Sequence, residues 1–145
     1  MKHVRSDIED DFMVRESRKI AVIGAGNVGA TCAFVMAERK LGDIVLLDIY
    51  EGFAKGKALD MSQGGQVLNY DGKITGTSKY EDIADADVVV VTSGFPRQPG
   101  MSREDLIGKN AEIISQVGAG ITVLGQLEEK WASIDVLSDP RAIPS

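Results

Sequence analysis

The sequence predicts an α/β fold, a doubly wound parallel sheet that is incomplete, and three observations support this prediction. Short apolar runs alternate along the chain with segments of helical periodicity. The runs are apolar at consecutive positions, which is typical of parallel strands covered on both faces. The length of 145 residues suits one domain, and 43% hydrophobic with 26% charged residues is ordinary for a globular chain.

Four buried strands are predicted where apolar runs are bounded by glycine, charged residues or threonine. They cover residues 19–24, 43–48, 73–77 and 87–92. Right-handed crossovers between parallel strands place the first and fourth strands side by side at the centre of the sheet.

Three helices are predicted between and after these strands. Residues 28–41 form the first, with Gly42 as its stop signal, and residues 52–63 form the second. The third begins after Ser102, which forms a capping box with Asp105 three residues later. The predicted apolar face of this third helix consists of Leu106, Ile107, Ile113, Ile114 and Val117.

The chain divides into three segments. Residues 1–17 are read as a flexible acidic tail, and residues 18–117 as the folded domain. The glycines that follow Val117 are expected to end the third helix. Residues 118–145 form an atypical segment of the kind that a truncation or a frameshift would produce.

Composition excludes several classes of protein. The net charge of −6 argues against a nucleic-acid partner, and the sequence contains no run of 18 apolar residues that would span a membrane. The acidic N-terminus lacks the apolar region of a signal peptide, and Met13 is an alternative start to Met1. The single cysteine, Cys32, is read as core filler in a reducing, cytoplasmic compartment. No metal site is predicted.

A glycine-rich motif follows the first predicted strand and opens the first predicted helix. It consists of Gly24, Ala25, Gly26, Asn27, Val28 and Gly29. The first glycine permits a tight turn, the second allows close approach of a pyrophosphate, and the third lets helix and strand pack closely. The free N–H groups at the helix start favour phosphate. Together with the strands, this motif predicts a Rossmann-like dinucleotide site.

Asp48 ends the second predicted strand, at the spacing from the glycines that suits a ribose-binding carboxylate. A carboxylate at this place accepts hydrogen bonds from the ribose hydroxyls and repels a 2′-phosphate. NAD is therefore the predicted cofactor, and the alternative is a plain strand-end aspartate.

The loop after the fourth strand carries two arginines, Arg97 and Arg103, among two prolines and two glycines. Such a loop borders the ligand crevice of a doubly wound sheet and is suited to closing over a substrate. Arginine pairs with carboxylates in two-point geometry, so an anionic substrate is predicted. Two solvated surface arginines are the alternative, and their spacing alone does not decide between the two.

Five segments in order resemble the malate dehydrogenase branch of the lactate/malate dehydrogenase family, over about residues 18–117. They are GAGNVG, LLDIYEG, GKALDM, VVVVTSGFPRQPGMSRED and NAEII. The resemblance implies that Arg97 pairs with the far carboxylate of malate or oxaloacetate, where lactate dehydrogenases usually carry glutamine. It implies that Arg103 polarises the reacting carbonyl and that Asn110 contacts the cofactor. Ser93 stands where alanine is more usual.

The resemblance implies an oxidoreductase of the tricarboxylic acid cycle that assembles as a homodimer or homotetramer. In the family, the histidine, aspartate and further arginine of catalysis lie downstream of the matched stretch. The single histidine here, His3, lies in the acidic tail and matches no catalytic motif. No catalytic residue is therefore assigned, and the chain alone is expected to lack turnover.

Three alternatives remain open at this point: an incomplete malate dehydrogenase, an NAD-binding module without chemistry, and a fragment without function. An incomplete sheet would leave the fourth strand with an open edge and exposed apolar faces. Marginal stability and self-association are therefore also expected.

Overall fold

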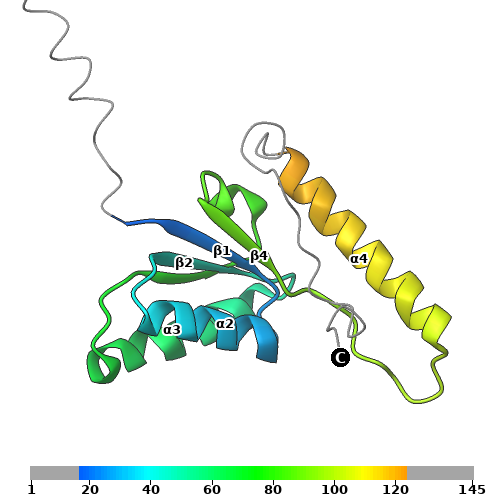
Figure 1. The fold of residues 1–145 in the computed structure, drawn as a ribbon, viewed down its shortest axis with the longest axis horizontal. Helices are drawn as coiled ribbons and strands as arrows, with labels where there is room; N and C mark the ends of the chain where they lie inside the picture. Colours follow the sequence, from blue (N-terminus) through cyan, green and yellow to red (C-terminus); the bar gives the residue numbers. More distant parts are fainter. Residues whose placement is uncertain (1–16, 124–145) are drawn as a thin grey trace, which may run out of the picture.

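Four parallel strands form a single sheet in the order β3-β2-β1-β4 (Figure 1). The computed structural model describes residues 17–123. The four predicted strands are confirmed, each shortened by one or two residues at its ends. Their bounds are β1 Lys19–Ile23, β2 Asp43–Leu47, β3 Ile74–Thr77 and β4 Val88–Val91.

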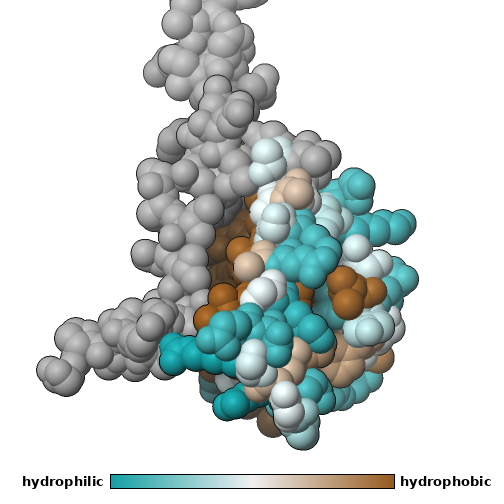
Figure 2. All heavy atoms as spheres, turned by 90° about the vertical axis from the view of Figure 1, so that its right-hand side faces the viewer, coloured by the Kyte–Doolittle hydropathy of each residue, from teal (hydrophilic) through white to brown (hydrophobic). Residues whose placement is uncertain are grey.

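Strand β1 lies between β2 and β4 and pairs with both. Its register joins Ile20 to Val88 on β4, so the predicted pairing of the first and fourth strands is confirmed. The prediction that both lie at the centre of the sheet is wrong for residues 17–123, because β4 is an edge strand there. Val88 and Val91 are 45% and 41% exposed, since no further described strand pairs with that edge. Figure 2 shows hydrophobic atoms at the surface on the side of the molecule where helix α4 (Arg103–Val123) lies.

The core has two halves, one on each face of the sheet. Alternate residues of a strand point to opposite faces. Ile20 and Val22 therefore face helices α2 (Asn27–Glu38) and α3 (Glu51–Leu68), while Ala21 and Ile23 face the other side. That second face is covered by a short 3₁₀ helix, η1 (Tyr80–Ile83), and by the last turns of α4. Figure 1 shows α2 and α3 on one side of the sheet and α4 on the other. This two-sided burial explains why the strands are apolar at consecutive positions.

Helix α2 (Asn27–Glu38) ends before the predicted stop at Gly42. The chain turns at Lys40, which has a left-handed φ of 54°. Leu41 N donates to Met36 O at 3.1 Å and closes the helix end, as in a Schellman motif. A lysine in the left-handed region therefore ends the helix in place of the glycine.

Helix α3 (Glu51–Leu68) is longer than the predicted 52–63. It continues through Gly64 and Gly65 and ends at Asn69, whose φ is 55°. Gly65 lies against Tyr70, and a Cβ there would come within 2.9 Å of Tyr70 O. The glycine is used for close packing rather than for ending the helix.

Helix α4 (Arg103–Val123) corrects two predictions. The expected break after Val117 is wrong, because the helix runs on through both glycines. Val117 and Ile121, one turn apart, are buried against the sheet, and Gly120 lies against the ring of Tyr80. The predicted apolar face is also only partly buried: Leu106 and Ile113 are half-buried, and Ile107 and Ile114 are exposed.

Several predictions fall outside the described residues. They concern residues 1–16, including His3 and the alternative start at Met13, and residues 124–145 of the atypical segment. Within the described range, Cys32 is half-buried on α2. None of the helices in residues 17–123 combines the length and hydropathy needed to cross a bilayer.

Candidate functional site

The glycine-rich loop leaves the carboxyl end of β1 and enters α2. Gly24 has φ +104°, and a Cβ there would lie 2.8 Å from Thr92 Oγ1. A Cβ on Gly29 would lie 1.8 Å from Gly24 O, so helix and loop touch at this point. Both positions therefore require glycine for reasons internal to the fold.

Gly26 differs from the other two glycines of the motif. A Cβ at Gly26 would meet no atom within 4 Å, so the fold itself does not need a glycine there. Gly26 is also the N-cap of α2, and no side chain caps the helix. An open approach to the uncapped start of a helix fits a phosphate group, which N–H groups and the helix dipole attract.

Asp48 lies directly after β2, next to the glycine-rich loop. The parallel pairing of Ile23 with Leu47 brings the two strand ends together. Asp48 Oδ2 accepts from Ala25 N at 2.8 Å, and Oδ1 accepts from Tyr50 N at 3.1 Å. The carboxylate is thus held in a fixed orientation at the carboxyl edge of the sheet. This placement fits a residue that accepts hydrogen bonds from a ribose.

Asn110 lies on α4 and holds the loop that follows β4. Its Oδ1 accepts from Phe95 N at 2.7 Å, and its Nδ2 donates to Leu106 O at 3.0 Å. Lys109 extends over the ring of Phe95, with Nζ 4.5 Å from the ring centroid. Both polar atoms of the Asn110 side chain are therefore engaged within the β4–α4 unit, a role that the sequence did not indicate.

The two arginines lie on this same unit, Arg97 in the loop and Arg103 at the first position of α4. Both side chains are exposed, and neither forms a hydrogen bond or ion pair with another residue in 17–123. The predicted capping box below Arg103 is confirmed: Asp105 N donates to Ser102 Oγ at 3.1 Å, and Asp105 Oδ2 accepts from Ser102 N at 3.2 Å. Ser102 Oγ also donates to Asp105 Oδ2 at 2.7 Å. The hydrogen bonds that the hydroxyl and the backbone N–H of Ser102 donate to this carboxylate lower the pKa of Asp105.

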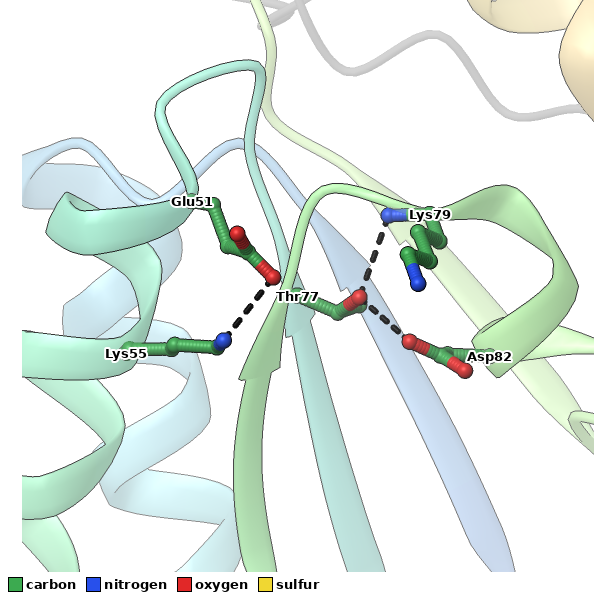
Figure 3. A network of polar contacts seen from close by, with 5 residues as sticks. All are labelled: Glu51, Lys55, Thr77, Lys79 and Asp82. Carbon is green, nitrogen blue, oxygen red and sulfur yellow. Dashed lines mark hydrogen bonds and ion pairs between the residues drawn. The ribbon is translucent and has the colours of Figure 1, made fainter.

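A polar network that the sequence did not indicate lies at the carboxyl end of β3 (Figure 3). The Thr77 hydroxyl donates to the Asp82 carboxylate and accepts from Lys79 N at 3.0 Å. Close by, Glu51 pairs with Lys55 at 2.9 Å, and the hydrogen bond and charge of this lysine lower the pKa of Glu51. Because Asp48 N donates to Thr77 O at 3.0 Å, the network also fixes the backbone of Asp48.

A cavity in the described part of the chain lies apart from the glycine-rich loop. It has a volume of about 570 Å³, and its lining extends from Lys19, Asp43 and Lys73 near the amino ends of the strands to Thr77 and Asp82 at the carboxyl end of β3. Ligands of open parallel sheets bind outside the carboxyl ends of the strands, so we place the site at the glycine-rich loop and not in this cavity. Within residues 17–123, no cluster of three or more histidine, cysteine or acidic side chains is arranged to hold a metal ion.

Comparison with known proteins shows the family to which this fold belongs. The family "lactate/malate dehydrogenase, NAD binding domain" matches residues 18–140, which extends beyond the 18–117 of the resemblance. Malate dehydrogenase of Ehrlichia canis is 54% identical over 104 residues, which are 72% of this chain and 33% of that protein. The chain therefore spans about a third of the length of the relatives that it matches.

Two solved structures show the same fold. The apo malate dehydrogenase of Picrophilus torridus matches with a TM-score of 0.72 and 48% identity, covering 74% of this chain and 35% of that one. The malate dehydrogenase of Archaeoglobus fulgidus in complex with NADH matches with a TM-score of 0.69 and 38% identity, covering 72% and 36%. The chain belongs to the lactate/malate dehydrogenase family, as its NAD-binding domain.

Proposed function

We propose that this chain holds NAD at the carboxyl edge of its sheet. Gly24 to Gly29 would surround the pyrophosphate, Asp48 would accept from the adenosine ribose, and Asn110 would lie at the cofactor's edge. The observation that carries this proposal is the contrast among the glycines. Gly24 and Gly29 are required by contacts inside the fold, while Gly26 leaves space open at the start of α2. The likeness to a malate dehydrogenase solved with NADH supports the same cofactor.

The substrate proposed for the whole enzyme is malate or oxaloacetate, within the tricarboxylic acid cycle. Malate gives a hydride from C2 to NAD and a proton from its hydroxyl, yielding oxaloacetate and NADH. In this chain, Arg97 would bind the far carboxylate of the substrate, and Arg103 would stabilise the negative charge on the reacting oxygen. Two guanidinium groups without an anionic partner in residues 17–123 support this assignment.

The remaining steps need groups that residues 17–123 do not supply at the site. A positioned acid–base group usually contributes ~10²–10⁴-fold to the rate, and no described residue is placed to take the hydroxyl proton. We therefore propose an NAD-binding part without turnover of its own. A cytoplasmic location and assembly as a homodimer or homotetramer complete the proposal, and the lone cysteine is consistent with a reducing compartment.

The first test is a calorimetric titration of the full chain with NAD. Asp48→Ala is expected to weaken NAD binding about 10- to 100-fold, because hydrogen bonds to a charged group are lost. Asp71→Ala is the control, since that exposed aspartate lies in the segment before β3, away from the loop. Equal NAD affinity in the wild type and Asp48→Ala would refute the assignment of Asp48.

The second test separates the alternatives. Purified chain is mixed with malate and NAD, and NADH is followed by its absorbance. NAD binding with no NADH formed supports the binding part proposed here. Formation of NADH at an ordinary enzyme rate refutes it, and a chain that binds no NAD is the fragment without function.

A further inference from the structure

One peptide group of the glycine-rich loop is held at both of its polar ends. The carbonyl of Gly24 accepts from Thr92 Oγ1 at 3.1 Å, and the N–H of Ala25 donates to Asp48 Oδ2 at 2.8 Å. These two atoms belong to the same peptide unit. Thr92 follows β4 and Asp48 follows β2, so the unit at the end of β1 is held from both neighbouring strands.

The space around the Thr92 hydroxyl is closely filled. A Cβ on Gly24 would lie 2.8 Å from Thr92 Oγ1, and a Cβ on Gly29 would lie 2.6 Å from it. The hydroxyl oxygen is also 3.2 Å from Ile23 O, so its single proton is shared between two successive carbonyls. Glycine at 24 and 29 therefore makes room for the threonine as well as for the helix.

The direction of this peptide influences the direction of helix α2. Ala25 is fully buried, and Gly26, the next residue, is the N-cap of α2. The N–H groups of the first helical turn point where the helix axis directs them, and that axis is joined to the sheet through the Gly24–Ala25 peptide. A peptide unit that is held at both ends cannot rotate without losing two hydrogen bonds.

We propose that Thr92 is a positioning residue of the cofactor site: its hydroxyl fixes the Gly24–Ala25 peptide and thereby aims the start of α2 at the pyrophosphate. This inference rests on the proposed binding of NAD. The inference gives the carboxyl end of β4 a role in phosphate binding, in addition to its place beside the loop that carries Arg97. The competing interpretation is that Thr92 only packs at a strand end.

The test uses two variants of the full chain. Thr92→Val keeps the shape and removes the hydroxyl, and Thr92→Ser keeps the hydroxyl and removes the methyl group. NAD and ADP-ribose contain the pyrophosphate, whereas adenosine contains only the ribose and base. Thr92→Val is expected to weaken NAD and ADP-ribose about tenfold and to leave adenosine unchanged. Thr92→Ser is expected to bind all three like the wild type.

A packing role gives a different pattern. Loss of stability alone would leave all three affinities unchanged at a temperature where the variant is folded, and general damage to the site would weaken all three equally. Either result overturns the inference. Thermal unfolding of both variants establishes that temperature.

Hydrogen exchange at the Ala25 amide provides a readout that does not depend on binding. In Thr92→Val this amide should exchange about tenfold faster than in the wild type, because its peptide has lost one of two anchors. If the wild type binds no NAD, the proposed function fails, and a faster exchange would still show that Thr92 holds the loop. Unchanged exchange would overturn the inference whether or not NAD binds.

Discussion

Asn110 and Phe95 are joined by a hydrogen bond of 2.7 Å, in which the Phe95 backbone N–H donates to the Asn110 side-chain oxygen. The two residues lie 15 positions apart. A cofactor-contacting residue in the family resemblance thus also connects α4 to the loop that carries Arg97. This hydrogen bond therefore constrains the position of the loop that carries Arg97 relative to α4.

Replacing Asn110 tests how strongly the loop is held. Asn110→Ala is expected to lower the free energy of unfolding by about 1 kcal/mol, because the hydrogen bonds to Phe95 and Leu106 are lost. The Phe95 amide should then exchange faster with solvent. Asn110→Asp is the matched control, since a carboxylate oxygen can still accept from Phe95 N. Equal protection of this amide in Asn110→Ala and the wild type would contradict the prediction.

Substitutions of two glycines in the glycine-rich loop should separate effects on folding from effects on NAD binding. Gly29→Ala is expected to lower the free energy of unfolding by about 1–3 kcal/mol, because the new Cβ would lie 1.8 Å from Gly24 O. Gly26→Ala has open space around it and should cost at most about 1 kcal/mol, as alanine is a poorer N-cap than glycine.

The affinity for NAD should depend on Gly26 for a different reason. In Gly26→Ala the methyl group enters the space proposed for the pyrophosphate, so NAD should bind at least about tenfold more weakly to a folded protein. Calorimetric titration and urea unfolding measure the two effects separately. Wild-type affinity in Gly26→Ala would mean that the pyrophosphate does not approach this residue.

Two glycines of α4 offer a second matched pair. Gly120→Ala should destabilise the protein by about 1–2 kcal/mol, because its Cβ would lie 2.6 Å from the Tyr80 ring. Gly118→Ala meets no atom within 4 Å and should stabilise the helix by up to about 1 kcal/mol. Urea unfolding of both variants tests this pair. Stabilisation by both would show that α4 does not pack on Tyr80.

The capping box makes the start of α4 sensitive to acid. The pKa of Asp105 is lowered in the folded chain, so this carboxylate stabilises the fold above its unfolded pKa. That contribution is lost as the pH falls through the lower, folded pKa. Ser102→Ala removes the hydroxyl that donates to Asp105, and the pKa of Asp105 should rise toward its ordinary value.

A carboxyl NMR titration of Asp105 measures this change directly. Ser115→Ala, at an exposed position later in the same helix, is the control and should leave the Asp105 titration unchanged. If Ser102→Ala also leaves it unchanged, the capping box contributes nothing to the charge state of Asp105.

Local patterns determined much of this protein. Apolar runs identified the four strands because both faces of a parallel sheet are buried. The capping box could be predicted because its two residues interact within a single turn. The glycine-rich motif and Asp48 could also be identified, since a tight turn and a strand-end carboxylate are short-range features.

Other features were decided by tertiary contacts. Helix α4 continues past Val117 because Ile121 is buried on the sheet, and this burial outweighs a glycine penalty of only about 1 kcal/mol. Helix α2 ends at a left-handed lysine, which no propensity favours. The two hydrogen bonds that fix the Gly24–Ala25 peptide join residues that lie 23 and 68 positions apart in the sequence. These hydrogen bonds form only after the parallel strands have brought their carboxyl ends together. The sequence therefore supplies the hydrogen-bonding groups, but only the tertiary structure decides which of them lie within bonding distance.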